Sequence, residues 1–231
     1  MKVKELIKIT SIMLTSMIMT GCVNTLTKQE AFPEMYSGSQ QNNILVAPIV
    51  NNSTSSEASE YLNSTLAEPF ANKGYYVLPI PITADIFKSA GIVDGTELKG
   101  IPFTSYKDKF GADSVLFVTI EQWDTNYIVL AGNVTVGLKY VMVSTDTGKV
   151  IWSYSNTIVI DTSSSSGSLL VDLIATAIAT ATTDYIPVAQ QVNKLTTQSL
   201  PAGQYHPRYK KDGLDVIVEA NAASAAAAFN Q

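Results

Sequence analysis

Few side chains in this sequence could carry out chemistry, and they are scattered. The 231-residue chain contains one cysteine, Cys22, and one histidine, His206. A protein zinc site usually needs three or four Cys, His or carboxylate ligands, so any metal here would depend on carboxylates. His206 stands among tyrosines and prolines, which is more typical of a packed loop residue than of a general base. We therefore predict no metal site and no cofactor.

Three carboxylates near the strand predicted over residues 114–123 are the remaining candidates for acid–base chemistry. They are Asp113, Glu121 and Asp124. Two carboxylates can act as general acid and base where their side chains converge. At strand ends, however, such residues more often cap turns or stay solvated. Because no Gly-x-Ser-x-Gly nucleophile motif accompanies them, we predict no catalytic residues and no enzyme.

Binding of nucleotides or nucleic acids is also disfavoured. The segment 132–139 (GNVTVGLK) approaches a phosphate-binding loop, but its lysine comes one residue late and no Ser or Thr follows. Its alternation of apolar and polar residues predicts a strand instead. The formal net charge of the chain is -5, which excludes a broad basic surface for nucleic acid.

The cysteine is well placed for lipid attachment. Three lysines among the first eight residues precede an apolar run over 9–20, shorter than the roughly 20 residues of a membrane span and typical of a secretory signal peptide. Met-Thr-Gly stands directly before Cys22, which is the pattern of a bacterial lipobox, although Leu is more usual than Met19. We predict a signal peptide over 1–21 and a palmitate-bearing lipid on Cys22. A buried or redox-active thiol is the alternative.

The residues after the cysteine predict where the folded part lies. Val23 replaces the Asp that usually retains a lipoprotein at the inner membrane, so we expect the outer membrane, with the folded part on its periplasmic face. Residues 22–231 carry 12 Lys and Arg and 19 Asp and Glu, a formal charge of -7, so the lipid must do the anchoring. Residues 22–43 are polar without periodicity, which predicts a flexible tether.

A single domain is predicted over 44–214, with an α/β (α+β) fold. Short apolar runs alternate with amphipathic segments in its first half, and three alternating strands with tight turns follow as an antiparallel meander. We expect a mixed sheet with helices packed on it. The predicted strands are 44–50, 75–80, 114–123, 127–143 and 150–160, with turns at 124–126 and 146–148. The predicted helices are 58–73 (after a capping box at 54–57), 83–90, 103–110, 169–185 and 187–200, and an Ala-rich tail covers 215–231.

The helix predicted over 169–185 is apolar on nearly all sides. Polar residues recur every four positions from Asp172 to Asp184 and form one narrow stripe. Packing on the sheet is one interpretation, and a subunit interface is the other, since small residues such as Ala175 permit close helix approach. A membrane span is disfavoured by the two aspartates. The candidate interface residues are Asp172, Ala175, Thr176, Ala179 and Thr180.

Three segments resemble an outer-membrane lipoprotein family of unknown function that includes a neisserial surface antigen. They are ILVAPIVNNS (44–53), FGADSVLFVTIEQWD (110–124) and LPAGQYHPRY (200–209). The second segment is also similar to the wider group that contains the TolB amino-terminal domain, CsgG, PelC and LpoB. The resemblance implies a TolB-like α/β sandwich at the outer membrane without catalytic residues.

The resemblance also implies a task in the cell envelope. Family members accompany CsgG-like lipoproteins, so we expect a non-enzymatic accessory or scaffold component of an envelope assembly or export complex. Its expected partners are the membrane, through the lipid on Cys22, other envelope lipoproteins and further copies of the chain. The alternative is a regulator or enzyme acting on a periplasmic polymer such as peptidoglycan, with the carboxylates near Trp123 as its site.

Overall fold

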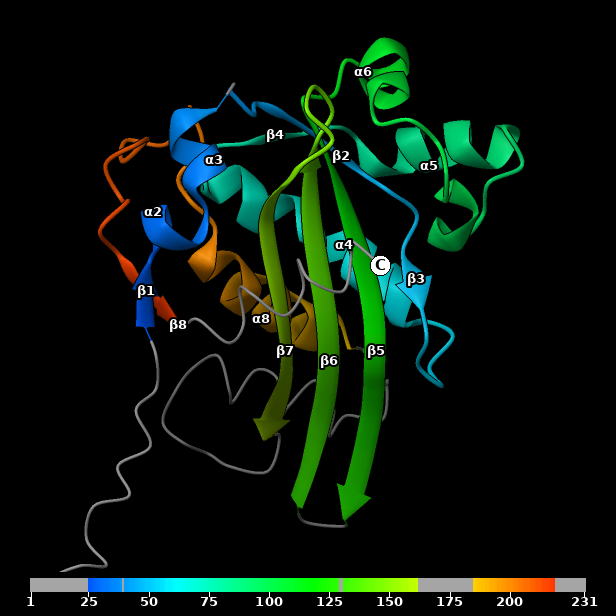
Figure 1. Cartoon of the computed structure of the whole chain (residues 1–231). Helices are drawn as coiled ribbons and strands as arrows, with labels where there is room; N and C mark the ends of the chain where they lie inside the picture. The colour runs from blue at the N-terminus through cyan, green and yellow to red at the C-terminus, as the bar shows by residue number, and fades with distance from the viewer. Residues whose placement is uncertain (1–24, 39, 129–130, 162–184, 219–231) are drawn as a thin grey trace, which may run out of the picture.

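The structure is a computed structural model of the chain (Figure 1), and it describes four segments of it. These are residues 25–38, 40–128, 131–161 and 185–218. Cys22, the predicted signal peptide and the five candidate interface residues of the helix over 169–185 lie outside the described residues.

The fold is α+β, with helices packed on a mixed sheet, as predicted. The strands are β1 (Thr25–Thr27), β2 (Asn43–Val46), β3 (Val50–Asn51), β4 (Tyr76–Val77), β5 (Ser114–Ile128), β6 (Ala131–Ser144), β7 (Val150–Asp161) and β8 (Val216–Val218). The helices are α2 (Lys28–Ala31), α3 (Pro33–Ser37), α4 (Ala58–Asn72), α5 (Ile80–Ser89), α6 (Thr104–Phe110) and α8 (Ile186–Thr196), with 3-10 turns η1 (Gly95–Leu98) and η2 (Thr197–Ser199).

The main sheet has six strands in the order β4-β2-β5-β6-β7, with β3 also paired to β5. β2 is parallel to both β4 and β5, whereas β5, β6 and β7 are antiparallel, which confirms the predicted meander. Ile44, Leu45 and Val46 are all buried because β2 has a strand on each side and helices over both faces.

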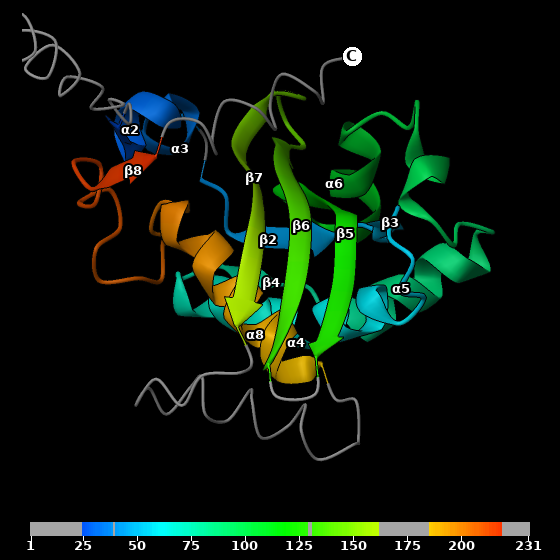
Figure 2. The ribbon, with the colours of Figure 1, turned by 90° about the horizontal axis from the view of Figure 1, so that it is seen from below.

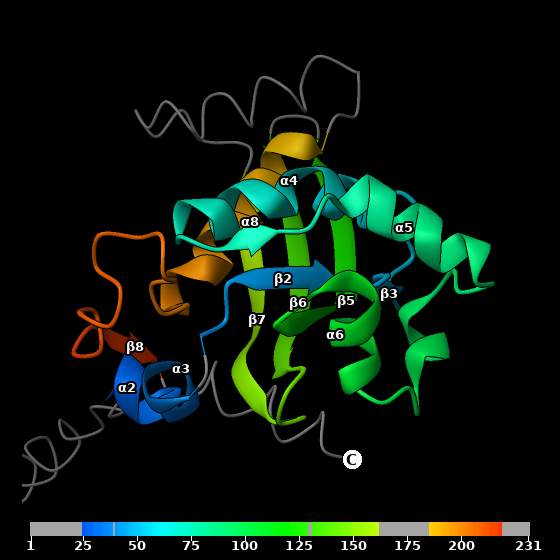
Figure 3. The ribbon, with the colours of Figure 1, turned by 90° about the horizontal axis from the view of Figure 1, so that it is seen from above.

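Helices cover the two faces of this sheet with separate apolar clusters. α4 and α8 lie behind the strands in Figure 1 and supply Leu62, Phe70 and Val188 to the larger cluster, around Trp152. The smaller cluster joins Phe87 of α5 and further side chains of η1 and α6 to the other face. Figures 2 and 3 show β1, β8 and α2 at the end of the molecule beyond β7, with α5 at the opposite end.

A buried polar link fixes α4 and α8 to the sheet. The hydroxyl of Tyr140 on β6 donates to Oδ1 of Asn193 on α8 (2.6 Å), and Nδ2 of Asn193 donates to Oγ1 of Thr65 on α4 (2.9 Å). Burial raises the pKa of the Tyr140 hydroxyl far above its ordinary value, so this group stays protonated and remains a donor. Because each group in the link is paired, its burial costs little.

The central hairpin is longer than the sequence pattern predicts. The turn predicted at 124–126 is wrong, because Asp124 pairs with Thr135 inside the ladder and β5 continues to Ile128. A bulge between Ile120 and Gln122 shifts the register just before this polar stretch. The second predicted turn is confirmed, and Gly148 adopts the positive φ (+67°) that it requires.

The glycines predicted to end helices do so, whereas the capping box predicted to start one does not form. Gly74 and Gly111 end α4 and α6 with φ values of +84° and +66°. The capping box predicted at 54–57 is wrong: Glu57 is the N-cap residue, and it makes no side-chain cap. Asn51 organises this turn instead, accepting from the Ser53 backbone and hydroxyl and donating to the Ser55 carbonyl.

The two ends of the described chain are ordered together, and within the flexible tether predicted over 22–43 the described residues 25–37 form β1, α2 and α3. Thr27 and Glu30 form a capping box that starts α2, and the Phe32 side chain enters the main core. β1 pairs antiparallel with β8, within the tail predicted over 215–231. Local composition could not indicate this, since each strand is stabilised by a partner about 190 residues away.

Candidate functional site

A buried ion pair joins the N-terminal segment to the loop after α8. Lys28 Nζ lies 3.0 Å from Asp212 Oδ2 and donates to the Leu200 carbonyl at 3.0 Å. Oδ2 of Asp212 also accepts from the Ala202 backbone (2.9 Å), while Oδ1 accepts from the Tyr36 hydroxyl (3.0 Å). The Lys28 and Asp212 side chains are only 5% and 3% exposed. We call this network, together with the β1–β8 pairing, the clasp.

The buried charges of the clasp are compensated by a counter-charge and by hydrogen bonds. A buried charge is tolerated only where a counter-charge and hydrogen bonds replace its lost hydration, and the Asp212 carboxylate receives three hydrogen bonds. Burial and the negative charge of Asp212 raise the pKa of the Tyr36 hydroxyl, so Tyr36 remains protonated and continues to donate. The clasp therefore holds β1 and α2 firmly against the folded body.

The segment 200–209, whose LPAGQYHPRY sequence carries the family resemblance, packs on the end of α4. Gly203 donates from its backbone N–H to the Lys73 carbonyl (2.7 Å), and the Tyr205 N–H donates to the Gly74 carbonyl (3.2 Å). A Cβ added at Gly74 would collide with the His206 backbone. A Cβ added at Gly203 would likewise collide with the Gly74 carbonyl, so both glycines are required for this close backbone-to-backbone contact.

The outer side of the same loop carries an exposed ion pair. Arg208 donates through Nη1 and Nη2 to the two carboxylate oxygens of Asp215, at 2.9 and 2.7 Å. These hydrogen bonds lower the pKa of the Asp215 carboxyl in the folded protein. The ion pair therefore stabilises the folded loop at pH values above the ordinary pKa of an aspartate, and this stabilisation is lost as the pH falls through the lowered pKa. His206 accepts at Nδ1 from the Arg208 backbone, which confirms its interpretation as a loop residue.

A second feature is a polar hollow of about 680 Å³ beside the C-terminal half of β5. Trp123 is 2% exposed there, and its indole Nε1 has no hydrogen-bond partner among the described residues. The Trp123 ring stacks on Tyr61, with centroids 6.1 Å apart, and meets Tyr185 edge-on at 6.5 Å. The lining residues are Thr54, Ser55, Glu57, Trp123, Asp124, Asn133, Thr135 and Tyr185.

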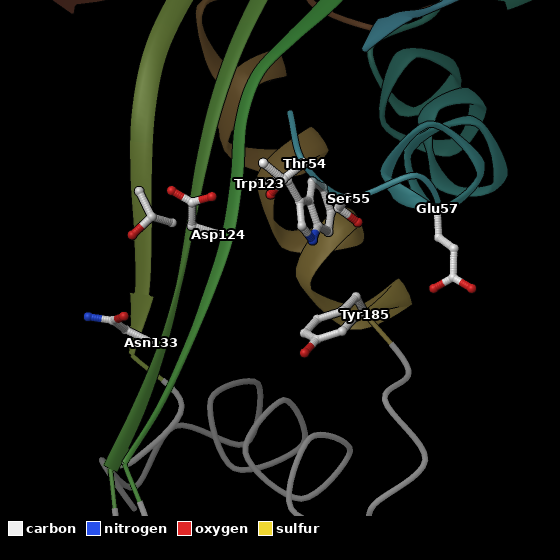
Figure 4. Close-up of a pocket in the computed structure, with 8 residues that line it drawn as sticks. Thr54, Ser55, Glu57, Trp123, Asp124, Asn133 and Tyr185 are labelled. Atoms are coloured by element: carbon white, nitrogen blue, oxygen red, sulfur yellow. The ribbon is translucent and has the colours of Figure 1, made fainter. Parts of the chain in front are cut away.

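The carboxylates of the hollow do not converge on one point. Figure 4 shows Trp123 and Asp124 on opposite sides of β5, as expected for consecutive strand residues, with Glu57 farther away at the start of α4. Asp124 accepts from the Gln122 side chain at 2.7 Å. This geometry suits recognition of a polar surface better than acid–base chemistry, which needs both groups on one substrate.

The other predicted carboxylates have structural partners elsewhere. Asp113 Oδ2 accepts from the backbone N–H groups of Asn42 and Asn43, at 3.0 and 3.1 Å, and so caps the start of β2. Glu121 accepts from the Asn52 side chain at 3.3 Å. At about 3.3 Å per residue, Asp113 and Asp124 lie roughly 35 Å apart along β5. The structure therefore does not bring the three candidate carboxylates together.

The described segments give no sign of a metal centre or a membrane span. They contain no group of three or more His, Cys, Asp or Glu side chains arranged to hold a metal ion. None of their helices combines the length and the hydrophobicity that crossing a bilayer requires.

Comparison with known proteins agrees with the resemblance. Residues 34–206 match the family model described as "Putative lipoprotein GNA1162-like". The chain is similar to "Putative lipoprotein NMB1124/NMB1162" of Neisseria meningitidis serogroup B, at 26% identity over 171 residues, which are 74% of this chain and 80% of that protein.

The solved structures with a similar fold include one that is named as a lipoprotein. The crystal structure of lipoprotein GNA1162 from N. meningitidis has 28% identity and a TM-score of 0.50, and the match covers 60% of this chain and 96% of that one. A PelC dodecamer from Paraburkholderia phytofirmans has 16% identity and a TM-score of 0.42, with 71% and 90% covered.

Proposed function

The chain belongs to the family of GNA1162-like lipoproteins, and from this premise we propose that it is an outer-membrane lipoprotein anchored through Cys22. It acts there, on the periplasmic face, as a non-enzymatic accessory or scaffold component of an envelope assembly or export complex that contains CsgG-like lipoproteins. The signal peptide over 1–21 and the lipobox support the anchoring part of the proposal.

The observation that carries the proposal is the short distance between the anchor and the folded body. The first described residue, Thr25, comes three residues after Cys22, and a chain spans at most about 3.6 Å per residue. A lipid on Cys22 thus holds the body within roughly 11 Å of chain from the membrane. A body held so closely, and by a buried clasp, keeps a defined position beside neighbouring envelope proteins instead of ranging freely on a tether.

Crosslinking in cells tests this proposal. We expect the tagged protein to take up labelled palmitate and to be recovered in an assembly larger than one chain that contains a second lipoprotein. The Cys22→Ser variant should lose the label and most of the crosslinked partner, because its local concentration at the membrane falls. Recovery of the wild-type chain as an unlabelled monomer, or unchanged crosslinking of Cys22→Ser, would contradict the proposal.

A second candidate function is recognition of a periplasmic polymer such as peptidoglycan at the polar hollow. The buried indole N–H of Trp123 favours it. This donor has no partner in the part of the chain that the structure describes, an unsatisfied buried donor is costly, and a ligand oxygen would pair it. The aromatic rings around Trp123 add apolar faces on which a sugar could stack.

Sedimentation with purified peptidoglycan separates this candidate from the first. If the polymer binds in the hollow, the double variant Glu57→Gln/Asp124→Asn should bind about tenfold more weakly, since two charged hydrogen-bond acceptors are lost. Glu121→Gln, an exposed carboxylate outside the hollow, is the matched control and should bind like the wild type. Equal binding of all three proteins, or none by the wild type, removes the candidate.

A further inference from the structure

The clasp places one loop of the chain beside the anchor point. The loop formed by residues 204–216, here called the anchor-side loop, leads from η2 into β8, where Val216 lies opposite Thr27 of β1. In Figures 1 to 3 this loop, β1 and β8 occupy the same end of the molecule. Because β1 begins three residues after Cys22, a lipid on Cys22 brings this end to the membrane surface.

Large apolar side chains of the anchor-side loop face solvent. Leu214 is 82% exposed, Tyr205 66% and Val216 65%. The neighbouring Ile217 instead enters the core together with Leu26, so the β1–β8 ribbon has one inner and one outer face, and Val216 lies on the outer one. Exposed apolar groups beside a lipid anchor suit the interfacial region of a bilayer, where they are removed from water.

The free charge of the loop is positive although the protein is acidic. Its two carboxylates, Asp212 and Asp215, are already paired with the cations of the clasp and the loop. Lys210 and Lys211 are exposed, and neither forms an ion pair with any described residue. Lys210 Nζ lies 5.6 Å from the centre of the Tyr209 ring. Anionic phospholipid headgroups attract lysines placed in this way, while they repel the acidic remainder of the body.

From these observations we infer that the anchor-side loop is a membrane-contact surface. Lys210 and Lys211 lie against anionic headgroups, and Leu214 and Val216 enter the interfacial region. The inference rests on the proposed anchoring, which supplies the proximity that so small a surface does not provide alone. Its consequence is orientation: the β1–β8 end faces the membrane, and the end that carries α5 and η1 faces away from it (Figure 2).

An artificial anchor makes the test independent of acylation. The mature chain carrying Cys22→Ser has no other cysteine, so Leu214→Cys introduces a unique site for an environment-sensitive fluorophore. An N-terminal polyhistidine tag attaches the protein to vesicles that contain a nickel-chelating lipid. The vesicles consist either of phosphatidylethanolamine with a minority of phosphatidylglycerol or of phosphatidylcholine alone. Val93→Cys, 70% exposed next to η1 at the opposite end, provides the control site.

We expect a blue shift of the fluorophore at position 214 on the phosphatidylglycerol vesicles, a smaller shift on phosphatidylcholine, and none at position 93. Adding Lys210→Glu/Lys211→Glu should abolish the shift, whereas Lys99→Glu/Lys109→Glu, which changes the total charge equally at exposed sites outside the loop, should preserve it. No shift at position 214, equal shifts at both sites, or equal effects of the two charge variants would overturn the inference. Failure of the proposed anchoring appears separately, as missing palmitate in cells.

Discussion

Replacing Asp212 with alanine is expected to destabilise the protein by about 3–5 kcal/mol, because it leaves the Lys28 ammonium buried without a counter-charge. The same change removes the acceptor of the Tyr36 hydroxyl and of the Ala202 N–H. The measurement is the free energy of unfolding in urea, made on the mature chain with Cys22→Ser. Loss of amide-exchange protection in β1 and α2 should accompany it, since the clasp holds these elements.

A double-mutant cycle separates the ion pair from general damage to the core. Lys28→Met alone strands the Asp212 carboxylate, and Asp212→Asn alone strands the Lys28 ammonium. The double variant removes both charges and should recover a large part of the lost stability. Lys149→Ala, which breaks the exposed pair with Glu34, is the control and should scarcely change the denaturation midpoint. Strictly additive effects of the two clasp substitutions would show that the pair is not coupled.

The contact between Gly74 and the 200–209 segment predicts a second large effect. Gly74→Ala should cost about 2–5 kcal/mol of unfolding free energy, because it combines the strain of an L-residue at φ +84° with overpacking against the His206 backbone. Backbone atoms cannot rotate away as a side chain can, so the loop must shift.

Gly91→Ala provides a closely matched control for this effect. Gly91 has nearly the same φ, +82°, and also follows a helix, yet a Cβ there meets nothing within 4 Å. It should therefore show only the conformational strain, about 1–2 kcal/mol. The difference between the two variants in urea denaturation isolates the steric contact, and equal losses would mean that the loop yields without cost.

Much of the fold could be predicted from periodicity and glycine positions. The alternation of apolar residues along β6 and β7 and the Asp146–Gly148 turn are local signals, and they gave the meander correctly. The turn predicted at 124–126 is wrong because polar residues also occur within long strands, where pairing with β6 satisfies their backbone. Polarity alone does not distinguish these two situations.

The site was harder to predict because its main interactions join distant parts of the chain. Lys28 lies in a polar stretch, where a lysine is normally solvated, and its burial depends on Asp212, 184 residues later. The local signals for order in this stretch are the Thr27–Glu30 capping pattern and Pro33 at the start of α3. Conversely, the three carboxylates near Trp123 looked close in sequence, but the length of β5 separates Asp113 from Asp124.

Pairing of β1 with β8, the first and the last of the described strands, imposes an order on folding. A chain that crosses the inner membrane from its N-terminus presents β1 long before β8 arrives, so Thr25 cannot meet Val218 until nearly all of the polypeptide has been translocated. On the proposed anchoring, the segment that carries Cys22 is therefore available for acylation before the β1–β8 pairing can form.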